Sequence, residues 1–269
     1  MNRIISLTLA IWLTASSVLS AADEKTKILL IGKDRDHAFT THEYMADGEL
    51  LAKCLRQTKG IEAVVSNGWP KDEAVLKDVK AIVLYTANGG DVLLAGPQRK
   101  QAEEMLKNGV GLTAIHWSTG AGKATGDDWQ KTLGGWFSTD FSKYLVRTTK
   151  LKQTDPKHPI CRGWKDYDLR DEFYIGLRFA ENIKPIMTAT IDDKEQTLGW
   201  VLERPESKNG RSFGFVCGHF HANFGEKPFR QAIVNGILWT AHLEVPEAGA
   251  PCEIIPKDLE LPPDTRPKK

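Results

Sequence analysis

The sequence predicts an α/β fold, namely a doubly wound, mostly parallel sheet flanked by helices, with antiparallel additions. Between Lys27 and Ile115, short apolar runs alternate with helical patterns. The runs are apolar on both faces, which is typical of parallel strands covered by helices on each side. After Gly120 strand-like runs dominate, and these predict antiparallel strands that build a wall over the ends of the parallel ones.

Each expected element has its own signal. A capping-box spacing joins Thr40 to Glu43, and apolar residues then recur at helical spacing through about Gln57. Pro97 begins another helix, because proline suits a first helical turn. Apolar runs predict strands at 27–31, 61–66, 81–85, 112–115, 144–151, 185–190, 197–203 and 212–217. Helical patterns cover 40–57, 72–77, 97–108 and 228–242, the last of them long and amphipathic.

The two ends of the chain are predicted to lie outside the domain. Residues 1–22 have the pattern of a cleaved secretory signal, with Arg3 followed by the mostly apolar stretch Ile4–Leu13. This stretch is too short to span a bilayer, so we expect a periplasmic or secreted protein with no stable membrane insertion after cleavage. An uncleaved anchor is the alternative. The domain then covers 23–245, and the proline-rich, charged segment 246–269 is expected to be an extended surface tail.

The charge of the chain excludes nucleic acid as a partner. The chain has 36 Lys+Arg and 35 Asp+Glu, and loss of Arg3 with the signal makes the two numbers equal. A balanced chain with no basic block has no electrostatic footprint for a nucleic acid. The remaining expected partner is a small-molecule carbohydrate, and a homo-oligomer stays open.

Four cysteines lack the CxxC spacing of a metal or redox motif: Cys54, Cys161, Cys217 and Cys252. One or two disulfides stay open in an oxidising compartment, and the sequence favours no pairing. Cys54 lies in a helical pattern and Cys217 in an apolar strand, so we expect both to be small buried hydrophobes.

His116 is the strongest candidate for chemistry. The apolar run Val110–Ile115 breaks at this histidine, and small residues follow Trp117. In open α/β sheets, the carboxyl ends of the strands are where ligands bind. Hydrolases that place a nucleophile at such a break hold it on a strained elbow. An imidazole in that position argues against cysteine-based acyl transfer.

Three more histidines are expected at the same edge of the sheet. His42 falls in the first turn of a predicted helix, where the helix dipole favours a neutral ligand or base. His219 and His221 follow the last strand in extended chain, where alternation puts both rings on one side, as metal sites require. With His116 they form a predicted site for a divalent metal, zinc or manganese. Surface positions are the alternative, and His37 is expected to be a surface loop residue.

Two acidic residues supply a candidate base. In the segment Asp171-Glu172-Phe173-Tyr174, strand alternation points the first and third side chains one way and the second and fourth the other. A carboxylate beside His116 would be a metal ligand, a general base or the partner that orients an imidazole. We therefore predict catalytic roles for His116, Asp171 and Glu172, with surface ion pairs to neighbouring arginines as the alternative.

Aromatic residues near these histidines predict a sugar site. Flat apolar faces beside polar groups suit sugar rings. We assign substrate binding to four residues: Trp117, Tyr174, Phe220 and Asn223. Packing in the core is the alternative for each ring.

Four ordered motifs resemble the ThuA-like (trehalose utilisation) family: Gly109–Leu112 leading to Ile115-His116, Asp171–Tyr174, Gly210–Gly214 leading to Gly218–His221, and Asn235–Trp239. The segment His42–Tyr44 also resembles the exported members. The resemblance covers residues 27–245 and implies a class I glutamine amidotransferase-like, flavodoxin-like fold without the amidotransferase triad. It also implies a role in using trehalose or related glycosides, in some bacteria beside oxidoreductases that make 3-keto sugars. Trp117 departs from the small residue that many members have, and this departure bears on the substrate.

The expected function is an exported, metal-assisted hydrolase or lyase that acts on a glycoside or a 3-keto glycoside. A carbonyl at C3 acidifies the neighbouring C–H groups, so a base can start elimination of the glycosidic substituent. A bound metal would stabilise the enolate. The alternative is a non-catalytic sugar-binding or scaffold domain. A true glutamine amidotransferase is disfavoured, because no cysteine occupies the elbow.

Overall fold

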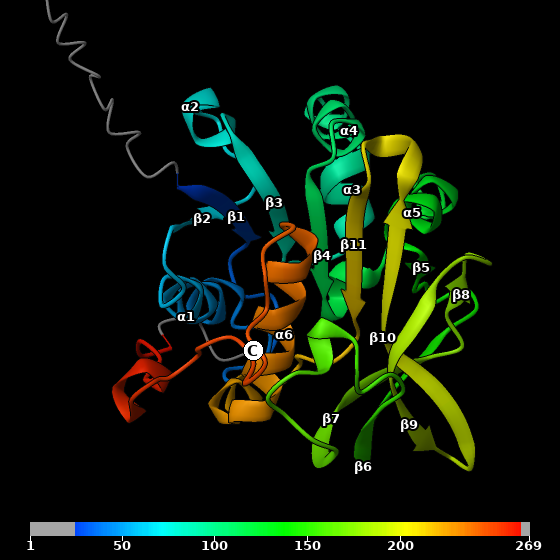
Figure 1. The fold of residues 1–269 in the computed structure, drawn as a ribbon. Coiled ribbons are helices and arrows are strands. Elements are labelled where there is room, and N and C mark those ends of the chain that lie inside the picture. Colours follow the sequence, from blue (N-terminus) through cyan, green and yellow to red (C-terminus); the bar gives the residue numbers. More distant parts are fainter. Residues whose placement is uncertain (1–24, 265–269) are drawn as a thin grey trace, which may run out of the picture.

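The structure is a computed structural model that describes residues 25–264 (Figure 1). The predicted signal peptide, 1–22, lies outside the described residues. Within the part of the chain that the structure describes, no helix is long and apolar enough to cross a membrane.

The described residues form one large mixed sheet. Its nine strands follow the order β2-β1-β3-β4-β11-β10-β9-β6-β7. Pairing is parallel from β2 to β11 and antiparallel from β11 to β7, so the predicted parallel core with antiparallel additions is confirmed. The strands are β1 (Thr26–Gly32), β2 (Ile61–Asn67), β3 (Val79–Leu84), β4 (Gly111–Ile115), β6 (Lys143–Gln153), β7 (Tyr167–Ile175), β9 (Lys184–Ile191), β10 (Lys194–Arg204) and β11 (Gly210–Phe215). A separate small sheet pairs β5 (Gly135–Trp136) with β8 (Arg178–Phe179).

Helices cover both faces of the parallel core, which makes the fold doubly wound as predicted. The helices α1 and α6 pack on one face, where α6 contacts β3, β4 and β11, and α3 to α5 pack on the other (Figure 1). The helices are α1 (Tyr44–Leu55), α2 (Glu73–Leu76), α3 (Gly89–Leu94), α4 (Arg99–Lys107), α5 (Gly126–Leu133) and α6 (Lys227–Thr240).

The central strands are apolar because both of their faces are buried. All residues of β4 are buried, and so are Ile28 to Gly32 in β1. Alternation is therefore absent from these strands, and each buried Leu or Ile side chain contributes about 2 kcal/mol of transfer free energy. The core thus holds the carboxyl ends of β1, β4 and β11 in fixed positions beside one another.

The structure corrects the prediction of the first helix. It begins at Tyr44 rather than at Thr40, because Thr40 and His42 have φ values of 70° and 50° and cannot continue a right-handed helix. The carboxylate of Glu43 still accepts a hydrogen bond from the Thr40 amide, at 2.9 Å. The capping signal was therefore real, but it closes the loop that precedes the helix.

Three elements of the middle region were not predicted or were predicted incompletely. The helix expected at 97–108 is α4 alone, and α3 precedes it. The helix α5 lies in the stretch that the sequence shows only as irregular. There Trp129 and Leu133 are buried, and Gly134 ends the helix in the left-handed conformation, with φ 89°. The strand β7 runs through the acidic segment Asp171–Tyr174 and begins four residues before it, at Tyr167.

The C-terminal segment is extended but partly buried, so its predicted surface position is wrong for that part. Ala250 and Cys252 are fully buried. The side chain of Asn235 on α6 accepts a hydrogen bond from the Ala250 amide at 2.8 Å, and Gln231 donates to the Ala250 carbonyl at 3.1 Å. Because the segment covers its outer side, α6 is buried nearly throughout from Phe229 on and is not amphipathic.

The cysteines of the described chain are free and buried. Cys54 in α1 and Cys217 after β11 are both completely buried, which confirms the prediction that they act as small hydrophobes.

Candidate metal centre

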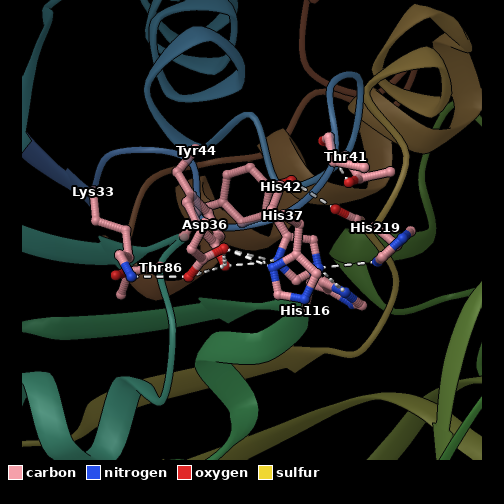
Figure 2. A network of polar contacts seen from close by, with 12 residues as sticks. Lys33, Asp36, His37, Thr41, His42, Tyr44, Thr86, His116 and His219 are labelled. Carbon is pink, nitrogen blue, oxygen red and sulfur yellow. Dashed lines mark hydrogen bonds and ion pairs between the residues drawn. The ribbon is translucent and has the colours of Figure 1, made fainter. Parts of the chain in front are cut away.

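Four side chains from distant parts of the sequence meet at the carboxyl ends of the parallel strands. His42 comes from the loop between β1 and α1, His116 directly follows β4, and His219 follows β11. Glu172 reaches them from β7. Figure 2 shows the three imidazoles together, with the loop of His42 above the strand ends. This is the edge of the sheet at which the sequence placed them.

His116 occupies a strained elbow, as predicted. Its φ of 54° is in the left-handed region, which a residue with a side chain adopts at a cost of about 1 to 2 kcal/mol. The Nδ1–H group donates to the Val216 carbonyl at 2.7 Å, and Thr119 donates to the His116 carbonyl at 2.8 Å. The bond to Val216 fixes the tautomer, so that Nε2 presents its lone pair to the other histidines. Burial, then the neighbouring His42, lowers the pKa of His116 well below its usual value.

His42 is held in the matching orientation. Tyr44 donates its hydroxyl hydrogen to Asp36 at 3.2 Å and therefore accepts a hydrogen bond from His42 Nδ1–H at 2.7 Å. The lone pair of His42 is thus on Nε2. Burial lowers the pKa of His42 below its usual value, and the charge of His37 adds to this effect against the opposing Asp36.

The ligand atoms of the cluster are spaced as a metal ion requires. His42 Nε2 lies 3.0 Å from His116 Nε2 and 2.9 Å from His219 Nδ1. Glu172 Oε2 lies 3.6 Å from the His116 nitrogen and 3.5 Å from the His219 nitrogen. All four atoms lie within 4.8 Å of one another. Ligands bound at about 2.1 Å from a shared ion are separated by about 3.0 to 3.4 Å, so these distances fit.

The chemistry of the four atoms also fits a metal. Neither His42 Nε2 nor His116 Nε2 carries a hydrogen, so their 3.0 Å contact is not a hydrogen bond and a shared cation makes it favourable. The pKa of His219 is lowered to about 4, mainly by burial and then by His42, which keeps this ring neutral. Three neutral imidazoles and one carboxylate form a donor set for ions such as zinc or manganese. The hydroxyl of Tyr174, 3.1 Å from His116 Nε2, completes the surroundings.

Alternation along β7 separates the two acidic residues, as predicted, and only Glu172 joins the cluster. The buried carboxylate of Asp171 accepts hydrogen bonds from the amides of Gly218 at 2.7 Å, His219 at 3.0 Å and Glu172 at 2.8 Å. Burial raises its pKa to about 7 against these hydrogen bonds. Asp171 therefore holds the loop that carries His219, and the structure does not bring it to the histidines as a base.

His221 does not join His219, contrary to the predicted pair. Its Nδ1 lies 2.5 Å from an Asp47 carboxylate oxygen, and its Nε2 donates to the Leu259 carbonyl at 3.0 Å. The chain is not extended here, because Gly218 has a φ of 129° and a 3₁₀ turn begins at His221. Alternation is lost, so the two rings point to different places. The predicted metal-ligating role of His221 is wrong in this geometry.

Replacing His221 with alanine is expected to lower the free energy of unfolding by about 3 kcal/mol while leaving metal binding intact. The reason is that Asp47, which is fully buried, loses the partner of its carboxylate. Urea unfolding of the metal-free chain measures the first effect, and metal analysis measures the second. The matched variant His219→Ala should show the reverse: loss of metal with a small change in stability. Metal loss in the His221 variant would contradict this assignment.

A cavity of about 420 Å³ opens beside the cluster and includes both polar and aromatic walls. It is lined by His37, Trp117, Phe137, Tyr144, Glu172 and Tyr174, among others. The ring of Tyr174 is stacked between Phe137 and His116, at centroid distances of 4.0 and 4.6 Å. The volume of the cavity falls in the range of small-molecule sites.

The predicted substrate-binding residues divide into two groups. Trp117 and Tyr174 line the cavity. Phe220 instead packs under the guanidinium of Arg170, 4.6 Å from the ring centroid, and Asn223 donates to the Arg170 carbonyl at 3.0 Å. The structure therefore places Phe220 and Asn223 beside the loop of His219 rather than in the cavity wall.

Sequence reasoning missed Asp36, Tyr44 and the position of His37. Asp36 Oδ1 lies 2.7 Å from His37 Nδ1 and accepts from Tyr44, so one carboxylate orients two histidines. Burial alone would raise the pKa of Asp36, but hydrogen bonds from His42, Lys33 and His37 hold it well below its usual value. The available signal was the place of Asp36 and His37 in the loop that follows the first strand, because ligands bind at such loops in these folds.

Tyr44→Phe is expected to weaken metal binding by about 10- to 100-fold, because outer partners fix the tautomer and orientation of a ligating histidine. The ring of Tyr44 is fully buried and would stay in place, so only the hydroxyl is removed. Competition with a chromogenic chelator measures the affinity. The control is Tyr167→Phe, which removes a buried hydroxyl that has no hydrogen-bond partner among the described residues. Equal affinities in Tyr44→Phe and wild type would show that Tyr44 does not orient His42.

The comparisons with known proteins agree with the fold. The chain is similar to a structure of a ThuA-like protein from Parabacteroides merdae, with 17% identity, a TM-score of 0.62 and coverage of 88% of this chain and 100% of the other. A ThuA-like protein from Bacteroides uniformis gives 17% identity, a TM-score of 0.61 and coverage of 80% and 91%. A cytoplasmic protein from Salmonella typhimurium gives 17% identity, a TM-score of 0.56 and coverage of 80% of this chain and 98% of the other. At these identities the likeness shows the fold.

No curated protein matches the sequence. A family model described as ThuA, trehalose utilisation, matches residues 27–240. This match covers the parallel core, the antiparallel strands and all four residues of the candidate metal centre. The chain therefore belongs to the ThuA (trehalose utilisation) family.

Proposed function

We propose that the protein is an exported, metal-dependent hydrolase or lyase of glycosides, with 3-keto glycosides as its best substrates. The observation that carries the proposal is the convergence of three neutral histidine nitrogens and one carboxylate beside a cavity with aromatic walls. His42, His116, His219 and Glu172 would hold the metal. When bound, a divalent cation supplies stabilisation for an oxygen that becomes negatively charged during a reaction.

The aromatic walls support a sugar as the substrate. Trp117 lies with its ring centroid 5.1 Å from His37 and 5.6 Å from His42, so an apolar face stands next to polar groups. Sugar rings present both C–H faces and hydroxyls, and this pairing suits them. The description of the family, trehalose utilisation, agrees with such a substrate.

His37 is the best-placed general base for an elimination. Its Nδ1 faces Asp36 at 2.7 Å, which leaves Nε2 as the acceptor, and the ring lines the cavity. His116 turns its only lone pair toward the cluster and is better suited to be a ligand. Asp36 thus orients the base in the way that a carboxylate orients a catalytic imidazole.

The proposed step needs only a proton acceptor and a stabilised oxygen. In a 3-keto glycoside the base removes the proton from C2, the electron pair forms the C1–C2 double bond, and the bond from C1 to the glycosidic oxygen breaks. The leaving group departs as an alcohol after it gains a proton. Tyr174, whose pKa burial raises well above the usual value, stays a neutral phenol and can hold an oxygen in place by donating a hydrogen bond.

A turnover assay of the metal-loaded chain tests the proposal. We expect a 3-keto disaccharide to be cleaved, with activity lost in a chelator and restored by zinc or manganese. Cleavage at equal rates with and without the chelator would overturn the metal-dependent mechanism. Saturable binding of the sugar without any turnover would instead assign the chain to sugar binding alone, as the degenerate-site alternative predicts. Residues 1–22 are the basis of the proposed export, and secretion of a fusion to this segment would test it.

A further inference from the structure

Tyr144 is the most exposed large apolar side chain that the structure describes, and it stands at the mouth of the cavity. Its exposed fraction is 61%, and that of its neighbour Val146 is 37%. Tyr144 also lines the cavity that contains His37, His42 and Glu172. Neither core packing nor the metal cluster explains an aromatic ring in this position.

The register of β6 and β7 places Tyr144 on the same face of this strand pair as Glu172. Tyr144 pairs with Tyr174, and Val146 pairs with Glu172. Directly opposed residues in antiparallel strands point to the same face. Tyr144 and Val146 therefore lie on the face from which Glu172 and Tyr174 reach the histidines, on the neighbouring strand. Figure 1 shows β6 and β7 below the ends of β4 and β11.

The charged residues of β6 that are nearest to Tyr144 are directed away from this face. Alternation places Lys143 and Arg147 on the opposite side, and Arg147 pairs with Asp192 at 3.1 Å. On the side of Tyr144, the chain offers Val146 and Thr148 before it reaches a charged residue. The partner strand β7 places Glu172 opposite Val146 and Arg170 opposite Thr148, so the apolar part of this face is limited to Tyr144 and Val146 at the mouth of the cavity.

We propose that Tyr144 and Val146 form an outer subsite that binds the ring of the leaving group, so that the substrate is a glycoside with a cyclic aglycone. This inference rests on the proposed function, which puts the reacting sugar next to the metal cluster. The neighbouring strands are about 5 Å apart, which is close to the separation of two linked six-membered rings. Both faces of the Tyr174 ring are covered, so the inner sugar would lie against Trp117 and Glu172 in the cavity, and the next ring would lie over Tyr144 at its mouth. The shared chemistry is a ring joined through the glycosidic oxygen, either a second sugar or an aryl group.

Calorimetric binding of three probes to the zinc-loaded chain tests the subsite. Methyl α-D-glucoside occupies the inner position only, p-nitrophenyl α-D-glucoside adds an aryl ring, and trehalose adds a sugar ring. We expect the two larger probes to bind wild type about three- to tenfold more tightly than the methyl glycoside, which is the gain of one stacked ring. Tyr144→Ala should abolish this difference and leave the affinity for the methyl glycoside unchanged. If Tyr144→Ala lowers the affinity for only one of the two larger probes, that probe identifies the kind of ring that the subsite binds.

Two variants control for loss of structure and for loss of exposed apolar surface. Tyr144→Phe keeps the ring and should keep the preference, as should Ile255→Ala, because Ile255 is exposed on the C-terminal segment away from the cavity. The outer subsite would be overturned if Tyr144→Ala still bound the two larger probes more tightly than the methyl glycoside, or if wild type bound all three probes equally. In both cases, binding of the methyl glycoside shows that the inner site is intact. Failure of all three probes to bind would overturn the subsite together with the sugar-directed function.

Discussion

Replacing His42 and His219 together with alanine is expected to lower the affinity for zinc by more than about 100-fold, because two of four ligands are removed. Wild type should bind close to one equivalent. Metal analysis after dialysis, together with competition against a chelator, measures both values. The backbone contact between His42 and the His219 carbonyl, at 3.0 Å, does not depend on the side chains, so the loop is expected to remain folded.

The control for this variant is His158→Ala, which removes a partly buried histidine far from the cluster. Its pKa is lowered to about 4 by burial, much as that of His219 is, so both replacements remove a neutral ring. The control should retain one equivalent of zinc. A double variant that still binds zinc like wild type would show that the four side chains are not the metal centre.

The pH dependence of zinc binding follows from the same burial. The pKa of His219 in the folded metal-free chain is lowered to about 4 from 6.5, and those of His42 and His116 are also lowered. Protons therefore compete weakly with the metal, and the affinity should be nearly flat above about pH 6 and fall below about pH 5. Because the folded chain binds fewer protons than the unfolded one, the free energy of unfolding should also fall as the pH drops from 6.5 toward 4. Chelator competition from pH 8 to 5 checks the first statement, and an affinity that falls steeply between pH 8 and 6.5 contradicts it.

His37→Ala is expected to reduce turnover of a 3-keto glycoside by about 10²- to 10⁴-fold with the zinc content unchanged. The reason is that His37 supplies the proton acceptor in the proposed step but is not one of the four proposed ligands, which are His42, His116, Glu172 and His219. Initial rates on the zinc-loaded variant, with metal analysis of the same sample, provide the measurement.

Asp36→Asn is the companion variant, since it keeps the size of the side chain and removes the charge that orients His37. It should lower the rate less than His37→Ala does, and it should also weaken metal binding through Tyr44 and His42. Full activity of His37→Ala would assign the base to another group, and Glu172 would be the next candidate, with its pKa raised by burial.

Local signals in the sequence were sufficient for the sheet and for the place of His116. The central strands are apolar throughout because both faces are buried, and this pattern is readable in one dimension. The strained turn at His116 was also readable, because a polar residue at the end of a buried strand needs a partner. Alternation in β7 correctly separated Asp171 from Glu172.

The partners of the histidines depended on contacts that no local pattern contains. The pairing of His219 with His221 failed because a glycine with positive φ ended the extended chain between strand and turn. Asp47, the partner of His221, lies 174 residues away on α1 and looked like an ordinary helical acid. The role of Tyr44 was likewise not predictable, because it depends on tertiary packing that brings its hydroxyl between His42 and Asp36.

The contacts of the C-terminal segment determine when the centre can be assembled. Arg35, at the start of the loop that carries His42, pairs with Glu43 and also with Asp264, 229 residues later in the chain. The Leu259 carbonyl likewise accepts from His221, two residues after a ligand. The first ligand loop is synthesised early, yet its supports are among the last described residues to be made. A growing chain therefore lacks these supports, and a metal ion at the proposed centre would be acquired in whichever compartment the finished chain folds.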